Sequence, residues 1–329
     1  MKHRTKIDRC IYTLVGVCMC VFLLPSTHVY AQAQGMGGDT RIDTDPLYPI
    51  AGEPFTARLA DYSGTLGAGD LLWYVDGVLQ KASKNQQSIT LAAPPVGKPL
   101  LIRAERSTSY GHKGVSLVVV PNEVDIIVES NTTAPYFYAG RRVPGNGTKA
   151  RIVAIPHIYT AKGVLLSPSD LSYSWNVDNE NKEGGNGGAL ETNVSGFGNS
   201  LVRLSIDSRD HLTKYETSFF IETAEPSFSF YTYSPLTGLS QNAVQDSYLP
   251  AKNEVTVRAQ PYGMSSDIYK NAQYNWSING ETVQNANRDP QMITLRKSGS
   301  GGTSDIGFSL RNLTELTQYV QGLFKVDFK

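Results

Sequence analysis

Three tryptophans, each at the centre of an alternating pattern of apolar residues, constrain the fold of this chain more than any other feature of its sequence. They are the only tryptophans in 329 residues, and successive ones lie 102 and 101 residues apart. Alternation at every second position places the apolar side chains of a strand on one face. Each pattern therefore predicts a strand with its tryptophan facing a buried core, and these core residues are Trp73, Trp175 and Trp276 in segments 71–75, 173–177 and 274–278.

Residues that favour tight turns follow two of these strands. Asp76-Gly77 and Asn279-Gly280 are pairs typical of two-residue hairpin turns. The segment after Trp175 differs, because residues 179–188 are polar and rich in glycine. We interpret this segment as an insertion that replaces the tight turn found after the other two strands.

A tryptophan on an inner strand about once every 100 residues is typical of immunoglobulin-like sandwiches. The chain also contains 30 glycines and 17 prolines, a composition that favours short strands joined by turns. The sequence therefore predicts an all-β protein of three tandem immunoglobulin-like β-sandwich domains, over residues 46–121, 122–223 and 224–329. The segments that join them are short and contain proline, which favours an elongated rod with limited bending.

Residues 1–33 have the organisation of a signal peptide. Four basic side chains accompany an apolar stretch of 15 residues, 10–24, which is shorter than the roughly 20 residues of a membrane-spanning helix. Ala31-Gln32-Ala33 then matches a cleavage site. We predict cleavage after Ala33, followed by a flexible segment over residues 34–45. Cleavage after Ala31 and retention of the segment as an uncleaved anchor are the alternatives.

The positions of the cysteines and the charge of the chain after residue 33 exclude several classes of site. All three cysteines lie in the leader, so the mature chain has no disulfide, thiolate metal site or cysteine nucleophile. Removing the leader leaves 26 basic and 29 acidic side chains, a net charge of −3, which gives no basic excess to attract nucleic acid or an anionic membrane. We expect no stable membrane span in the mature chain, and a secreted or cell-surface location.

Two later segments resemble a known group of proteins. Residues 134–144 (APYFYAGRRVP), followed by 152–156, and residues 230–238 are similar to phrases in uncharacterised exported proteins of candidate-phylum bacteria with small genomes. In that group such phrases mark successive immunoglobulin-like or PKD-like domains. The resemblance covers most of residues 124–329 and implies an extracytoplasmic, surface-associated β protein with no known catalytic residues.

The mature chain shows no residue pattern typical of an enzyme. Its three histidines, His112, His157 and His211, belong to different strand ends or loops, and no serine stands in a G-x-S-x-G turn. No pair of carboxylates stands out as the acid and base of a glycoside hydrolase. The chain is therefore predicted not to be an enzyme, and no catalytic residue and no cofactor are assigned.

One loop has oxygen-bearing side chains at alternate positions. Asn176, Asp178 and Glu180, followed by Glu183, loosely match a calcium-binding loop. The glycine required at the sixth position is missing, because Asn181 stands there. We interpret the loop as a solvated hairpin and assign no metal ligand, and the sequence leaves calcium binding there open.

Two aromatic clusters, near the starts of the second and third domains, are candidates for contact with a ligand or partner. Exposed aromatic rings can stack on sugar rings or anchor a protein. Packing within a domain or across a domain junction is the alternative interpretation. The candidate contact residues are Tyr136, Phe137, Tyr138, Tyr231 and Tyr233.

These observations predict a non-enzymatic, exported structural or scaffold protein at the cell surface or in a secreted assembly. Its rigid domains would set the reach of whatever they carry. The alternative is an adhesin or carbohydrate-binding surface protein that uses the aromatic patches or the end loops. Both hypotheses imply a protein or glycan partner at the cell surface, and neither involves nucleic acid.

Overall fold

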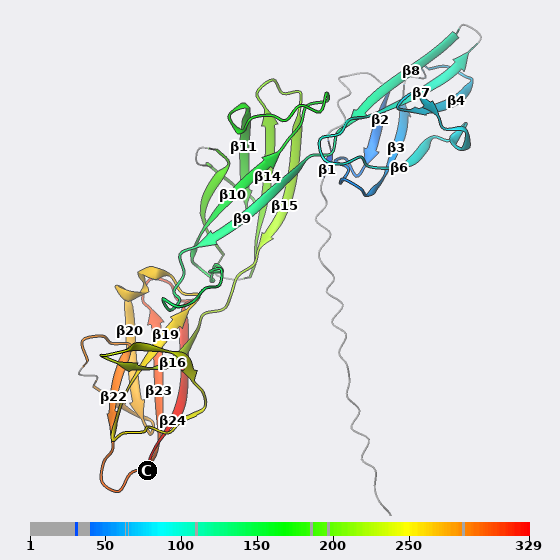
Figure 1. The fold of residues 1–329 in the computed structure, drawn as a ribbon. Helices are drawn as coiled ribbons and strands as arrows, with labels where there is room; N and C mark the ends of the chain where they lie inside the picture. Colours follow the sequence, from blue (N-terminus) through cyan, green and yellow to red (C-terminus); the bar gives the residue numbers. More distant parts are fainter. Residues whose placement is uncertain are drawn as a thin grey trace, which may run out of the picture.

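The strands of the chain form three consecutive β-sandwiches that follow one another end to end (Figure 1). The computed structural model describes residues 30–31, 40–62, 64, 66–108, 111–184, 187–195, 198–284 and 287–329. This architecture confirms the predicted all-β fold of tandem immunoglobulin-like domains. We call the sandwiches domain 1, domain 2 and domain 3 in chain order. Apart from Tyr30–Ala31, the predicted signal segment lies outside the described residues.

Domain 1 packs a sheet of three strands, in the order β2-β3-β6, against a sheet of four, β5-β4-β7-β8. The strands are β2 Thr40–Asp45, β3 Pro54–Asp61, β4 Asp70–Val75, β5 Val78–Leu79, β6 Ser88–Ala92, β7 Leu100–Thr108 and β8 Gly111–Val119, with a 3-10 turn, η1, at Lys81–Ser83.

Strand β2 corrects a prediction from the sequence. Residues 34–45 are predicted to be flexible, and this is wrong for 40–45, which pair with β3 from Thr40 opposite Asp61 to Asp45 opposite Thr56. Ile42 points into the core and is 2% exposed. Because Ile42 is the one apolar residue of the strand, the alternating signal that identifies other strands is absent here.

Domain 2 packs the sheet β13-β10-β9 against the sheet β1-β15-β14-β11-β12. The strands are β9 Glu123–Ser130, β10 Lys149–His157, β11 Leu171–Val177, β12 Glu180–Lys182, β13 Ala189–Asn193, β14 Ser200–Ser208 and β15 Lys214–Ile221, with η2 at Pro168–Asp170 and the short β1, Tyr30–Ala31, beside β15.

Domain 3 packs the sheet β17-β16-β19-β22 against the sheet β18-β24-β23-β20-β21. The strands are β16 Ser227–Ser234, β17 Gly238–Val244, β18 Ser247–Tyr248, β19 Glu254–Tyr262, β20 Ala272–Ile278, β21 Glu281–Val283, β22 Met292–Arg296, β23 Gly302–Asn312 and β24 Tyr319–Phe328, with η3 at Ser266–Tyr269. Strand β18 runs parallel to β24.

The three tryptophans occupy equivalent places, on β4, β11 and β20, and are 0%, 2% and 2% exposed. The indole N–H of Trp73 donates to the Gln86 carbonyl at 2.8 Å, and that of Trp276 donates to the Pro290 carbonyl at 3.0 Å. Both carbonyls lie just before a strand of the opposite sheet, so each indole links the two sheets. The Trp175 N–H has no partner among the described residues.

The same hairpin turn follows all three tryptophan strands. Both turn residues have positive φ in each case: 47° and 80° at Asp76-Gly77, 50° and 70° at Asp178-Asn179, and 50° and 86° at Asn279-Gly280. The strand β12 pairs with β11 directly after the turn. The predicted insertion in place of a tight turn after Trp175 is therefore wrong, because asparagine adopts positive φ more readily than most residues with a side chain.

Truncation of Trp175 tests the importance of these cores. Trp175→Ala should lower the free energy of unfolding of domain 2 by about 3–5 kcal/mol, the range for removing a large buried aromatic side chain. Far-UV circular dichroism should then show an early transition, while the fluorescence of Trp73 and Trp276 reports domains 1 and 3. A loss below about 1 kcal/mol would contradict the role of the indole as a core residue.

Candidate functional site

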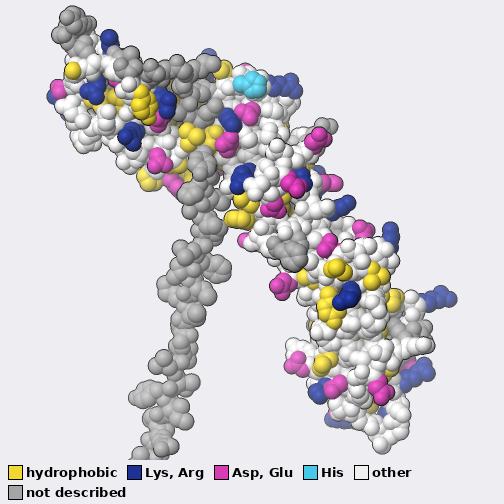
Figure 2. All heavy atoms as spheres, turned by 180° about the vertical axis from the view of Figure 1, so that it is seen from behind, with side chains coloured by type: hydrophobic (Ala, Val, Ile, Leu, Met, Phe, Trp, Pro, Cys, Tyr) yellow, Lys and Arg dark blue, Asp and Glu magenta, His cyan; other side chains and the backbone are white. Residues whose placement is uncertain are grey.

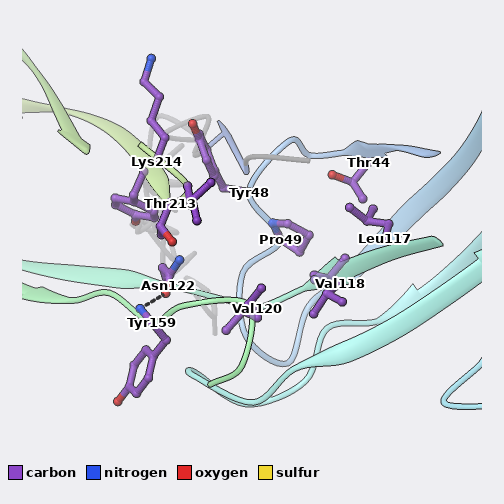
Figure 3. Close-up of a pocket in the computed structure, with 14 residues that line it drawn as sticks. Thr44, Tyr48, Pro49, Leu117, Val118, Val120, Asn122, Tyr159, Thr213 and Lys214 are labelled. Carbon is purple, nitrogen blue, oxygen red and sulfur yellow. Dashed lines mark hydrogen bonds between the residues drawn. The ribbon is translucent and has the colours of Figure 1, made fainter. Parts of the chain in front are cut away.

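The first junction, between domains 1 and 2, is built around Tyr48. This residue follows β2 in domain 1, yet its side chain belongs to the core cluster of domain 2 and is 6% exposed. Its ring centroid lies 5.5 Å from that of Tyr215 on β15. Figure 3 shows Tyr48 between the strands of the two domains. One domain thus contributes a core residue to the next.

Two further contacts lie at the same junction, one made by the linker and one between the two domains. The Asn122 side-chain oxygen accepts a hydrogen bond from the Tyr159 backbone N–H at 2.7 Å (Figure 3). Gly97 of domain 1 lies against the Tyr159 ring, since a Cβ on Gly97 would stand 2.6 Å from a ring carbon. A cavity of about 50 Å³ remains between the domains. This volume suits water and excludes an organic ligand.

The second junction, between domains 2 and 3, is made by the segment between β9 and β10, residues 131–148, which we call the docking segment. Its Thr133 exchanges backbone hydrogen bonds with domain 3: the Thr133 N–H donates to the Met264 carbonyl at 2.7 Å, and the Gly263 N–H donates to the Thr133 carbonyl at 3.1 Å. The Thr133 hydroxyl accepts from the Met264 N–H at 3.2 Å. Thr133 is 5% exposed, so these bonds are protected from water.

The far end of the docking segment is also fixed. The Pro144 carbonyl accepts a hydrogen bond from the Ala224 N–H, in the linker to domain 3, at 2.8 Å. The Gln318 side chain donates to the Asn146 carbonyl at 3.3 Å. A Cβ on Gly145 would stand 1.8 Å from the Gly263 carbonyl oxygen, so glycine is required there. Both ends of the docking segment are thus bonded to domain 3 or to the linker that leads to it.

The five aromatic residues predicted as candidate contacts meet at this second junction. Phe137 of the docking segment packs edge-on against Tyr231 of β16, with ring centroids 5.6 Å apart. Tyr136 packs against Phe137 at 5.2 Å, and Tyr138 lies 6.3 Å from Tyr262 of β19. The two predicted clusters are therefore one cluster, formed by both domains.

Exposure divides this cluster into two parts. Tyr231 is 6% exposed, so it does not belong to an exposed patch, and its hydroxyl makes a short hydrogen bond with that of Tyr262. Burial, together with this hydrogen bond, raises the pKa of Tyr262 above its ordinary value. Tyr136 is 75% exposed and Tyr138 45%. The buried rings hold the domains together, and the exposed rings remain accessible.

An open cleft of about 460 Å³ lies beside the exposed rings, and we call it the junction cleft. The docking segment forms one wall, and β16, β17, β19 and η3 of domain 3 form the others. Of the predicted residues, Tyr136 and Tyr233 line it, whereas Phe137, Tyr138 and Tyr231 do not. Its lining residues are Ala134, Pro135, Tyr136, Tyr233, Gly238, Leu239, Arg258, Gln260 and Tyr269.

The sequence analysis missed three polar or aromatic residues of this cleft: Arg258, Gln260 and Tyr269. Arg258 and Gln260 occupy alternate positions on β19, on the face opposite the buried Val257 and Ala259. That alternation was visible in the sequence, but nothing in it indicated that the outer face of this strand meets another domain.

The histidines considered for catalysis lie on different elements of the fold, and carboxylates of the calcium-like loop already bond to other groups of the chain. His112 lies on β8, His157 ends β10 and pairs with Asp125 at 3.2 Å, and His211 lies in the turn between β14 and β15. In the calcium-like loop, the Asp178 carboxylate accepts from the Leu201 N–H at 2.8 Å and Glu180 pairs with Lys182. Within the described ranges, no group of three His, Cys, Asp or Glu side chains is placed to hold a metal ion.

The described part of the chain contains no helix of the length and apolar character needed to cross a membrane.

Comparison with known proteins identifies no family for this chain. No family model matches the chain, and no curated protein sequence matches it. It is similar to the three N-terminal domains of the highly immunogenic outer capsid protein of bacteriophage RB49, with 13% identity and a TM-score of 0.22, over 92% of this chain and 99% of that one. It is also similar to immunoglobulin domains 1–5 of Sidekick-1, with 10% identity and a TM-score of 0.30, over 85% of this chain and 56% of that one.

A third similar structure is SGBP-B of the mixed-linkage glucan utilization locus of Bacteroides ovatus, in complex with a mixed-linkage heptasaccharide. The identity is 12% and the TM-score 0.23, over 92% of this chain and 70% of that one. At these identities and TM-scores no ligand or partner of the three proteins is carried over to this chain.

The docking of domain 3 can be weakened by a single change. Thr133→Val keeps the shape of the side chain but leaves the buried Met264 N–H without an acceptor, which should cost about 1–3 kcal/mol of docking free energy. Hydrogen exchange at the Met264 amide should accelerate accordingly. Thr133→Ser, which keeps the hydroxyl, is the control, and equal exchange in both variants would contradict the assigned contact.

The first junction should be sensitive to alkaline pH. Burial, and to a smaller extent the charge of Glu123, raises the pKa of Tyr215 to about 12. Burial also raises the pKa of Tyr48. A phenol in the unfolded chain ionises near about pH 10, so the unfolded state loses its proton first as pH rises. The stability of domain 2 should therefore be full below about pH 10 and fall towards about pH 12.

Denaturant unfolding followed across this pH range measures the effect. In Tyr215→Phe the decline should be shallower, because one of the two raised phenols is gone. An unchanged slope in this variant would show that Tyr215 is not the group responsible.

Proposed function

We propose that this protein is a non-enzymatic, exported spacer or scaffold that holds its ends at a set distance, at the cell surface or in a secreted assembly. The observation that carries the proposal is the docking segment. A connection of 18 residues between two strands of domain 2 binds domain 3 by backbone hydrogen bonds, side-chain hydrogen bonds and aromatic packing. We also propose that the chain belongs with the exported bacterial proteins that its sequence resembles.

Contacts of this kind favour a fixed angle between domains over a flexible string. Domains joined by a bare linker move freely by default, and a restricted orientation needs an interface. Here each junction buries residues from both domains: Tyr48 and Tyr215 at the first, and Thr133 and Tyr231 at the second. Such junctions fix the orientation of each domain relative to the next, which a spacer requires.

The surface charge is consistent with this role. Lys and Arg side chains are interspersed with Asp and Glu along all three domains, with no extended area of one sign on the face that Figure 2 shows. A surface of mixed charge neither steers a polyanion nor binds an anionic bilayer strongly. Export to the cell exterior rests on the signal-like leader of residues 1–33.

Small-angle X-ray scattering of the mature chain tests the spacer proposal. Three sandwiches, each about 30 Å long at roughly 3.3 Å per residue of strand, should give a radius of gyration of about 30 Å, against about 19 Å for a compact chain of this size. A compact value would overturn the proposal.

A loop variant provides the matched control for rigidity. Replacing residues 134–143 by a Gly-Ser segment of equal length removes Phe137 and Tyr138 from the junction but keeps the chain length. The distribution of interatomic distances should broaden in this variant. Identical scattering from both proteins would show that the docking segment does not fix the angle.

A further inference from the structure

We propose that the junction cleft is a binding site for a neutral saccharide. This inference goes beyond the spacer role and does not depend on it, because the cleft is argued from its own side chains. Its walls come from two domains: Pro135 and Tyr136 from domain 2, and Tyr233, Arg258, Gln260 and Tyr269 from domain 3. Figure 2 shows apolar side chains gathered at the end of domain 3 that adjoins domain 2.

The aromatic side chains supply the surfaces that a sugar ring needs. Tyr136 is 75% exposed and Tyr269 46%, and they stand on different elements around the cleft. A pyranose ring has an apolar face of C–H groups that packs on an aromatic ring. The Tyr136 hydroxyl donates to the Leu239 carbonyl at 3.5 Å, which holds this ring beside domain 3. Tyrosine offers this contact at a low cost in side-chain entropy.

The polar side chains of the cleft are fixed in place. Gln260 is 4% exposed, and its side-chain N–H donates to the Pro261 carbonyl at 3.3 Å. Within the described ranges, this donation is the hydrogen bond that the Gln260 side chain makes, and its oxygen accepts none. The amide oxygen of a residue that lines an open cleft can accept a hydrogen bond from a ligand hydroxyl.

Arg258 is held by its neighbours in the same way. Its Nε and Nη2 both donate to the Gln291 side-chain oxygen, at 3.2 and 3.0 Å, and Nη2 lies 3.4 Å from an Asp289 oxygen. These contacts orient the guanidinium and leave Nη1 free of protein partners among the described residues. Nη1 is therefore a hydrogen-bond donor in a fixed position.

The charge of the site favours a neutral ligand. Asp289, just outside the lining, balances Arg258 at 3.4 Å, and among the described residues Arg258 is the one charged side chain that lines the cleft. An acidic ligand would have to compete with Asp289 for the guanidinium, whereas sugar hydroxyls need only the unused donor and acceptor. A volume of about 460 Å³ falls in the range of small-ligand sites.

A glycan array with the mature protein, followed by calorimetry with the best neutral oligosaccharide, tests the inference. Tyr136→Ala and Tyr269→Ala should each weaken binding roughly tenfold or more, because each removes a stacking surface. Tyr136→Phe keeps the ring and should bind within about threefold of the original protein. Both residues are well exposed, so the variants should fold, which thermal denaturation checks.

The matched control is Tyr62→Ala, which removes a tyrosine that is 77% exposed in domain 1, away from the cleft, and should leave binding unchanged. Loss of binding in Tyr62→Ala, or full binding in Tyr136→Ala and Tyr269→Ala, would overturn the assignment to this cleft. Absence of binding to any neutral glycan would overturn it as well, and so would binding only to acidic glycans or to a proline-rich peptide. None of these results bears on the scattering of the rod, so the two proposals fail separately.

Discussion

The burial of one indole between the two sheets of each domain is the interaction on which the whole molecule depends. All three cysteines lie within residues 10–20, ahead of the three sandwiches, so no disulfide can join the two sheets of a domain. The indole N–H of Trp73 and of Trp276 donates instead to a carbonyl just before a strand of the opposite sheet. These two indoles thus fill the core and also link the sheets by a hydrogen bond, one function of the bridge in other sandwiches of this kind, whereas among the described residues Trp175 acts through packing alone.

Much of the fold could be predicted from the sequence, because burial on one face imposes alternation on a strand. The patterns around the tryptophans located β4, β11 and β20, and the turn pairs after two of them located the hairpins. The failures have local causes. Strand β2 has a single apolar residue, Ile42, and Asp178-Asn179 forms without glycine the turn that glycine marks elsewhere. Strand β2 depends on its pairing with β3, and the turn depends on a backbone geometry that is rare without glycine. Alternation of apolar residues indicates neither.

The candidate site could be predicted only in part, since it exists through a contact between distant parts of the chain. The sequence identified the aromatic residues of both clusters, and Tyr136 and Tyr233 do line the junction cleft. Packing across a domain junction was the alternative interpretation of these residues, but the sequence could not pair Phe137 with Tyr231, because its pattern does not show which strand a loop will contact. Arg258 and Gln260 were likewise visible only as the polar side of a strand.

The docking segment places the contacts that fix the domain angle and the proposed saccharide site in one junction. Because Tyr136 stands on domain 2 and Arg258 on domain 3, the cleft is complete only while the domains are docked. A ligand that touches both walls must therefore favour the docked orientation, by an amount set by its concentration relative to its dissociation constant. The coupling is reciprocal, so the hydrogen bonds at Thr133 that fix the angle also preorganise the cleft. In the proposed spacer, binding of the proposed saccharide would therefore stiffen the second junction.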